Sequence, residues 1–334
     1  MISFGIIGSG WRSEFYLRIA ALLPEKFTVT GIFIRNPVKK EEFRIKYADK
    51  ICDSIEELRQ TGPDFVVSCV RKDGICDMIT TLCRDGIAVL SETPLGADIG
   101  QIENFEKQVR PAWRVQIAEQ FHFQPNNQAV KKVIDSGILG KVHQVQLSCC
   151  HDYHAVSLIR FFLDIGREIP QITTVTLPDA VTACNGRNGF LEDIKETTSR
   201  QAISILKYKG KSALYDFSDA QYFSDIRKSR IVIRGTKGEI VNDECTYLCG
   251  AVPLHFSFHR NMRGAGENLD GLYLESIVGN GTVLYENPFG KARLSDEEIA
   301  VATCLIKMRE YLENGREFYS VSDAAADART AYQQ

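Results

Sequence analysis

A glycine turn directly behind the first apolar segment limits the folds this chain can adopt. Ile2–Ile7 has the near-continuous apolar character of a buried strand, and Trp11–Leu23 has the pattern of a helix. Gly8-Ser9-Gly10 stands between them. The first glycine permits a tight turn, and the second lets the backbone approach a pyrophosphate at the helix N-terminus. The order strand, turn, helix therefore predicts a dinucleotide-binding loop, with an ordinary strand-to-helix turn as the alternative.

Three more residues continue this predicted loop into the helix. Ser13 stands where packing of the helix on the strand requires a small side chain. We expect Arg12 to reach the cofactor phosphates, and Trp11 to pack over the loop or beside the adenine.

Short apolar runs continue to alternate with amphipathic stretches over the first 120 residues. The later runs predict further strands at Thr28–Ile34, Asp64–Val70, Ile87–Ser91 and Arg114–Phe121. One helix is expected to begin at Pro37 and a second at a capping box that starts with Ser54. A third is expected to end near Arg84, and a fourth to span Ile99–Val109. Apolar strands separated by helices indicate a parallel sheet covered on both faces. Residues 1–120 are therefore predicted to form a six-stranded, doubly wound α/β domain of the Rossmann type, and the apolar runs give ranges for five of the six strands.

The pattern changes after Pro125, where hairpin signals replace the alternation of strands and helices. Glycine turns at Lys209-Gly210, Gly235–Gly238 and Asn280-Gly281 separate alternating runs. Residues 121–334 are predicted to form an α+β domain on a mostly antiparallel sheet. Its last helices, one of them capped by Ser295 and Glu298, are free to pack back on the first domain.

The end of the second predicted strand bears on the choice of cofactor. An NAD-binding domain carries an acidic residue there for the ribose 2′-hydroxyl, but this chain has Ile34 followed by Arg35. A guanidinium can pair with a 2′-phosphate, which a carboxylate would repel. We therefore predict NADP, with NAD still possible. The alternative for Arg35, and for Arg71 and Lys72, is a solvated surface charge.

Composition excludes several other classes of protein. The 40 basic and 43 acidic side chains give a net charge of −3, which provides no basic footprint for nucleic acid or a membrane surface. The N-terminus lacks the features of a signal peptide, and no apolar run approaches the ~20 residues that span a bilayer. Ten scattered cysteines without a CxxC pair indicate a reduced, cytoplasmic protein.

Two segments contain potential metal ligands, but neither is predicted to form a metal site. Cys149-Cys150-His151 contains adjacent residues, which point to opposite faces when they lie in a strand. His255 and His259 share one face of a predicted strand, but two imidazoles without a third ligand favour a surface position.

The glycine loop, joined to further motifs, resembles the glucose–fructose oxidoreductase / myo-inositol dehydrogenase (Gfo/Idh/MocA) family. Glu92-Thr93-Pro94 is similar to the family's Glu-Lys-Pro motif, and His122–Pro125 looks like its Arg-Phe-x-Pro segment. Ser136–Gly140 and Gly235–Gly238 are similar to its recurrent glycine turns. The resemblance covers most of the chain in the right order. It implies an NAD(P)-dependent oxidoreductase acting on CH–OH groups of a small polyhydroxylated substrate, such as a sugar, inositol or related imine.

The resemblance also implies where partners and ligands bind. The substrate would lie between the two domains, and the second sheet would form a homodimer or homotetramer. The predicted cofactor-binding residues are Gly8, Ser9, Gly10, Trp11, Arg12, Ser13, Ile34, Arg35, Val70, Arg71, Glu92, Thr93 and Gln120.

Departures from the family pattern affect the predicted chemistry. Thr93 replaces the motif's lysine, and Cys150 and Ser157 occupy two carboxylate positions around His154. An imidazole with a pKa near ~6.5 suits proton transfer, so His154 is the predicted acid/base group, with core packing or helix capping as its alternative. The remaining predicted residues are Tyr153, Thr93 and Lys72 for catalysis, and His122, His151 and Ser157 for substrate binding.

The same departures leave a second function open. A chain that has lost these charged groups would bind a dinucleotide without turnover, as a sensing or regulatory protein.

Overall fold

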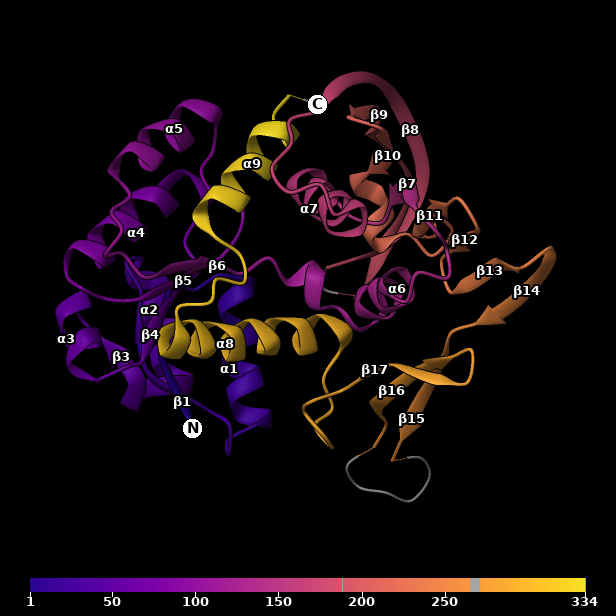
Figure 1. Ribbon diagram of the computed structural model, residues 1–334. Helices are drawn as coiled ribbons and strands as arrows, with labels where there is room; N and C mark the ends of the chain where they lie inside the picture. Colours follow the sequence, from indigo (N-terminus) through magenta and orange to yellow (C-terminus); the bar gives the residue numbers. More distant parts are fainter. Residues whose placement is uncertain (188, 265–270, 334) are drawn as a thin grey trace. The chain divides into compact units, whose positions relative to one another are not determined.

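The computed structural model describes residues 1–187, 189–264 and 271–333 (Figure 1). The chain divides into two compact units. The first comprises Met1–Pro125, Met262–Glu275 and Asn287–Ala328, and the second comprises Asn126–Asn261, Ser276–Glu286 and Arg329–Gln334. Two late segments thus group with the first unit, so the second unit is not one continuous stretch.

The first unit is built on a six-stranded parallel sheet with the order β3-β2-β1-β4-β5-β6. This confirms the predicted doubly wound sheet. Its strands are β1 (Ile2–Ile7), β2 (Phe27–Phe33), β3 (Ile51–Cys52), β4 (Phe65–Ser68), β5 (Val89–Ser91) and β6 (Val115–Ile117). The two-residue β3 has no periodicity of its own, which is why no range was predicted for it.

Helices cover both faces of this sheet, as Figure 1 shows. They are α1 (Trp11–Leu22), α2 (Pro37–Tyr47), α3 (Ile55–Gln60), α4 (Ile75–Arg84) and α5 (Ile99–Gln108). Successive residues of β1 point to opposite faces. The Phe4 ring meets Tyr16 of α1, with centroids 6.2 Å apart. Gly5 instead faces α3, where an added Cβ would lie 2.9 Å from Leu58 Cδ1.

A late helix, α8 (Asp296–Asn314), completes the first unit. The predicted Ser295–Glu298 capping box begins it. Glu298 also pairs with Arg18 of α1 at 2.5 Å, and Arg309 pairs with Asp64 at 2.8 Å. The chain then runs along the edge of β6, where Ile117 donates its N–H to the Tyr319 carbonyl at 2.9 Å, and continues into α9 (Val321–Ala331).

The second unit contains an eight-stranded sheet with the order β14-β13-β12-β11-β7-β10-β9-β8. All its neighbouring strands pair antiparallel except β7 and β10. The strands are β7 (Val142–Ser148), β8 (Gln171–Gly186), β9 (Gly189–Tyr208), β10 (Lys211–Ser218), β11 (Arg230–Gly235), β12 (Gly238–Val241), β13 (Glu244–Cys249) and β14 (Val252–Ser257). The predicted mostly antiparallel second sheet is confirmed.

The remaining elements are two helices, α6 (Pro125–Asp135) and α7 (Asp152–Leu163), and a smaller sheet. That three-stranded sheet consists of β15 (His259–Arg263), β16 (Tyr273–Gly279) and β17 (Thr282–Glu286). The predicted hairpin turns at 209–210, 235–238 and 280–281 all join antiparallel strands.

One face of the large sheet remains largely open to solvent. α7 packs against β7 and β10, where Leu147 and Tyr215 are buried. The opposite face presents a mostly apolar row, which we call the open-face row: Ile205, Leu214, Val232 and Val241, joined through cross-strand pairing, with Gln146 of β7 between Leu214 and Val232. Ile205 is 55% exposed.

Within the described ranges, no helix combines the length and apolar character needed to cross a bilayer.

Candidate functional site

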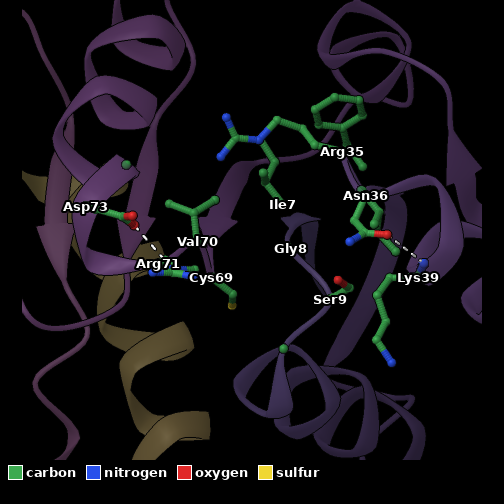
Figure 2. Close-up of a pocket in the computed structure, with 14 residues that line it drawn as sticks. Ile7, Gly8, Ser9, Arg35, Asn36, Lys39, Cys69, Val70, Arg71 and Asp73 are labelled. Carbon is green, nitrogen blue, oxygen red and sulfur yellow. Dashed lines mark hydrogen bonds and ion pairs between the residues drawn. The ribbon is translucent and has the colours of Figure 1, made fainter.

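A cavity of about 620 Å³ opens at the carboxyl ends of β1, β2 and β4 (Figure 2). Ligands of doubly wound sheets bind at this edge, where the strand order reverses. The lining includes seven of the predicted cofactor-binding residues: Gly8, Ser9, Gly10, Ile34, Arg35, Val70 and Arg71. It also includes residues not predicted for the site, among them Asp73 and Gly74 at the approach to α4.

The two glycines of the loop have different physical roles. Gly8 has φ +131°, and an added Cβ would lie 2.6 Å from the Cys69 carbonyl oxygen. The fold itself therefore requires glycine at position 8. Gly10 has φ −82°, and an added Cβ would meet nothing within 4 Å. Since packing within the protein does not require glycine at position 10, the open space above it is available to a ligand.

The start of α1 adds favourable polar groups to the loop. Gly10 is the N-cap residue, and no side chain caps the helix. The first N–H groups of a helix have no intrahelical partner and carry partial positive charge. The loop therefore suits an anionic group.

Cationic side chains dominate the rim of the cavity. Arg35 reaches across it, because a Cβ built on Gly74 would lie 3.7 Å from the Arg35 Nη2, and Figure 2 shows its side chain extending toward Val70. Lys39 pairs with Glu42 at 2.6 Å, and Arg71 lies 3.5 Å from Asp73. All of these pairs are exposed, so the cations remain accessible to an anion in the cavity.

A second group of predicted residues gathers beneath the start of α1. The guanidinium of Arg12 turns inward, with Nε 3.3 Å from Glu92 and Nη1 2.9 Å from Glu297. The Gln120 amide, oriented with its oxygen toward Arg12, accepts from Nη2 at 3.2 Å. Tyr16 donates to Glu92 at 2.5 Å. The side chains of this Arg12 cluster are not among those that line the cavity, although Glu92 and Arg12 both act electrostatically on Cys69 of the lining.

Burial and charge pairing shift the pKa values in this cluster. Burial alone would lower the pKa of Arg12, but the carboxylates of Glu92 and Glu297 outweigh it and raise that pKa. Burial raises the pKa of Glu92, against the opposing effects of Arg12 and Tyr16. Burial also raises the pKa of Glu119, which follows β6, to about 7. Glu119 accepts from the Phe121 N–H at 3.2 Å.

The other predicted residues of the first unit lie around these two groups. Trp11 is 44% exposed, and its ring centroid lies 4.4 Å from that of Phe15. Lys72 is exposed, Thr93 is half-buried, and Ser13 is buried. The His122 ring packs edge-on against Tyr319, with centroids 5.1 Å apart.

The second unit brings three predicted residues together at the start of α7. The ring of Tyr153 lies 4.3 Å from that of His154, and the His151 ring lies 5.3 Å from each of them, measured between centroids. His154 is 4% exposed. Burial, and then the neighbouring His154, lower the pKa of His151. Ser157 is fully buried on the same helix.

Two tyrosines that were not predicted support this histidine cluster. Tyr222 Oη lies 2.5 Å from His151 Nδ1 and accepts from the His151 backbone N–H at 2.9 Å. Tyr215 Oη accepts from the Asp152 N–H at 3.1 Å. Both tyrosines come more than 60 residues later than their partners, as the 63- and 71-residue separations show. No local spacing in the sequence could have indicated them.

Among the described residues, no group of three or more His, Cys, Asp or Glu side chains is arranged to hold a metal ion.

Comparisons with known proteins agree with the geometry of the first unit. Residues 2–115 match the family described as the GFO_IDH_MocA oxidoreductase family with an NAD-binding Rossmann fold. None of the curated protein sequences matches the chain.

Several solved structures share the fold over nearly the whole chain. An oxidoreductase from Thermotoga maritima is 18% identical, with a TM-score of 0.64 and coverage of 99% of this chain and 96% of its own. A levoglucosan dehydrogenase bound to NADH and levoglucosan is 14% identical, with a TM-score of 0.67 and coverage of 99% and 97%. The Synechocystis biliverdin reductase, bound to biliverdin and NADP⁺, is 13% identical, with a TM-score of 0.64 and coverage of 99% and 97%.

At such identities these structures establish the fold alone, whereas the family match is a similarity of amino-acid sequence. Residues 2–115 match the model of the Gfo/Idh/MocA oxidoreductase family, with its NAD-binding Rossmann fold.

Proposed function

We propose that the protein is an oxidoreductase that binds NADP in preference to NAD and acts on a small polyhydroxylated substrate. The observation that carries the cofactor choice is the position of Arg35. It follows β2, where a carboxylate would select the ribose 2′-hydroxyl, and its guanidinium reaches over the cavity. A 2′-phosphate there would gain a charge-assisted, bidentate partner.

The residues of the cavity fit a dinucleotide. The space above Gly10 and the uncapped start of α1 suit the pyrophosphate, and Lys39 and Arg71 provide further positive charge at the rim. A bound nicotinamide supplies or accepts a hydride, which is the chemistry that the protein side chains lack.

The chain itself must move a proton at the substrate oxygen or nitrogen. His154 is our candidate for that step, because it is an imidazole held among Tyr153 and His151. Tyr153 and Thr93 would donate hydrogen bonds to the substrate, Lys72 would supply positive charge, and His122, His151 and Ser157 would complete its binding site. The substrate class rests on the family resemblance and on neighbours such as the levoglucosan dehydrogenase.

A thermal-shift titration with NADPH and NADH tests the cofactor proposal. Ligand at a hundredfold excess over its Kd stabilises the native state by about 2.7 kcal/mol. We expect the larger rise in Tm with NADPH. A larger rise with NADH would overturn the NADP preference, and no rise with either would overturn dinucleotide binding and with it both the enzyme and the cofactor-sensing proposals. Binding without turnover across a panel of sugars and inositols would favour the regulatory alternative.

We also propose that the protein self-associates through the open-face row. Ile205, Leu214, Val232 and Val241 supply apolar side chains to a strip across five strands, with Gln146 at its centre and the Arg230–Asp216 pair, at 2.7 Å, beside it. A two-fold contact would place the strip against its own copy, which is the commonest arrangement among homo-oligomers.

A further inference from the structure

Two neighbouring cysteines converge where the sequence predicted divergence. Adjacent residues of a strand point to opposite faces, but β7 ends at Ser148, just before Cys149 and Cys150. Beyond the strand the two Sγ atoms lie 3.7 Å apart. Cys149 is half-buried and Cys150 is fully buried. The pair is therefore a vicinal dithiol with one accessible and one protected thiol.

The surroundings of this dithiol connect it to the histidine cluster. His151 follows directly, and its backbone N–H and Nδ1 both contact the Tyr222 hydroxyl. Both thiols also lie close enough to Tyr222 to contribute to the raised pKa of its hydroxyl, although burial is the larger cause. A change in the bonding of the thiols would therefore move the backbone that carries His151.

We propose that Cys149 and Cys150 form a reversible peroxide-sensitive site. Cys149 Sγ attacks the O–O bond of a peroxide, which yields a sulfenic acid and releases one water or alcohol. Cys150 Sγ then attacks the Cys149 sulfur, the S–O bond breaks, and a water leaves. The two thiols lose two electrons and two protons, and the peroxide accepts them.

The geometry favours a bond that is easily reversed. The Cα atoms of neighbouring residues are about 3.8 Å apart across a trans peptide, shorter than the roughly 4.4–6.8 Å of ordinary disulfides. A bond between such neighbours is strained, and strained disulfides are the readily reduced, regulatory ones. Closing the Sγ atoms to about 2.05 Å must shift the segment between β7 and α7. The contact between His151 and Tyr222 is then lost.

The test is treatment of the folded protein with hydrogen peroxide, followed by alkylation, proteolysis and mass spectrometry of the peptides. We expect a peptide spanning Cys149 and Cys150 that is lighter by about 2 Da and resists alkylation until a thiol reductant is added. Sulfinic acid on Cys149 with no intramolecular bond in the wild-type protein would overturn the proposal.

Variants separate the two thiols and supply a matched control. In Cys150→Ser, oxidation should stop at a sulfenic acid on Cys149 that a dimedone reagent traps. Cys249 is an exposed thiol on β13, so Cys249→Ser should leave the 149–150 bond unaffected. Loss of that bond in Cys249→Ser would show that the oxidation passes through an intermolecular disulfide and would contradict the proposal.

Amide hydrogen exchange tests the link to the histidine cluster. The His151 N–H, which donates to Tyr222, should exchange at least about tenfold faster after oxidation of the wild-type protein. It should not change in oxidised Cys150→Ser, and the amide of buried Ile233 on β11 should change in neither protein. Unchanged exchange at His151 in the disulfide form would overturn the link. These readouts need no substrate or cofactor, so their failure is distinguishable from failure of the proposed function.

Discussion

Arg12 and Glu92 form an ion pair beneath the glycine loop, with Nε and Oε2 3.3 Å apart. Glu92 directly precedes Thr93, which stands where the family resemblance places a lysine. Glu297 also pairs with Arg12, at 2.9 Å. Two carboxylates thus surround one guanidinium, and the positive charge missing at Thr93 is not replaced by a free charge at Arg12. The pair instead fixes the start of α1 to the end of β5.

The two loop glycines should respond differently to alanine. Gly8→Ala should lower the free energy of unfolding by about 2–4 kcal/mol, because of the positive φ and the Cys69 carbonyl 2.6 Å from the added Cβ. Gly10→Ala should cost less than about 1 kcal/mol but weaken dinucleotide binding at least about tenfold. Urea unfolding and ligand titration of both variants measure this. Undiminished affinity in Gly10→Ala would contradict the proposed approach of the pyrophosphate.

Arg35→Asp should reverse the cofactor preference. A hydrogen-bonded charge contributes about 1.5–3 kcal/mol, so the ratio of NADPH to NADH affinity should fall about 10- to 100-fold. Titration calorimetry with both cofactors measures that ratio. Arg110→Asp makes the same change of charge at an exposed position outside the cavity and serves as the control. Equal ratios in the two variants would refute the role of Arg35.

Glu119 should make stability depend on pH. Its folded pKa of about 7 exceeds the ordinary value near 4.3, so between these values the folded state binds more protons than the unfolded state. The free energy of unfolding should therefore fall as pH rises through this window, by up to about 3 kcal/mol. Glu119→Gln should remove that loss.

Urea unfolding at pH 5 and pH 8 measures the effect. We compare the free energy of unfolding of Glu119→Gln with that of wild type at each pH. The difference should favour the variant more at pH 8 than at pH 5. The exposed Glu103→Gln on α5 is the control and should show no such gain. A parallel pH dependence in wild type and Glu119→Gln would show that Glu119 ionises without cost.

His154→Ala should lower kcat by about 10²- to 10⁴-fold if this imidazole transfers the proton. The rise in Tm with NADPH should persist, because the cavity at the glycine loop is unchanged. His143→Ala, at an exposed histidine of β7, should retain full turnover. Steady-state kinetics across pH decides the matter, and unaltered kcat in His154→Ala would leave the histidine with a packing role only.

Ile205→Arg should convert an assembled protein to monomers. The position is 55% exposed within one chain, and a two-fold interface would bury two added charges there. Val38→Arg places the same charge on α2, at a side chain that is 67% exposed. This control should leave the molecular mass of the assembly in solution the same as that of wild type. Light scattering with size-exclusion chromatography compares the three proteins. A monomeric wild type would disprove assembly through the open-face row.

The sequence predicted the first sheet because buried parallel strands have a strong local pattern. Ile2–Ile7 matched β1 residue for residue, and the Ser295–Glu298 capping box began α8 as expected. Short or solvated strands carry no such pattern. β3 has two residues, and the polar, largely exposed β8 was not predicted at all.

The candidate site likewise contains residues that the sequence predicts and contacts that it does not. The glycine loop and Arg35 were predicted from local spacing, and the structure places them around one cavity. The pairing of Arg12 with Glu297 and of His151 with Tyr222 joins residues far apart in the chain. Such contacts arise from tertiary packing, which the sequence of either partner alone does not encode. The convergence of Cys149 and Cys150 depended on where β7 ends, and helix and strand boundaries are the weakest part of sequence-based prediction.

The position of α8 has a consequence for the order of events during synthesis. Arg18 on α1 pairs with Glu298, 280 residues later in the chain, and Arg12 gains its second carboxylate partner from the neighbouring Glu297. A ribosome adds about 5–20 residues per second, so α1 must wait many seconds for this neighbour to emerge. During that interval the nascent first unit exposes the surface that α8 later covers. A chaperone that binds apolar helix faces would find its target there, and would be released when the last helices arrive.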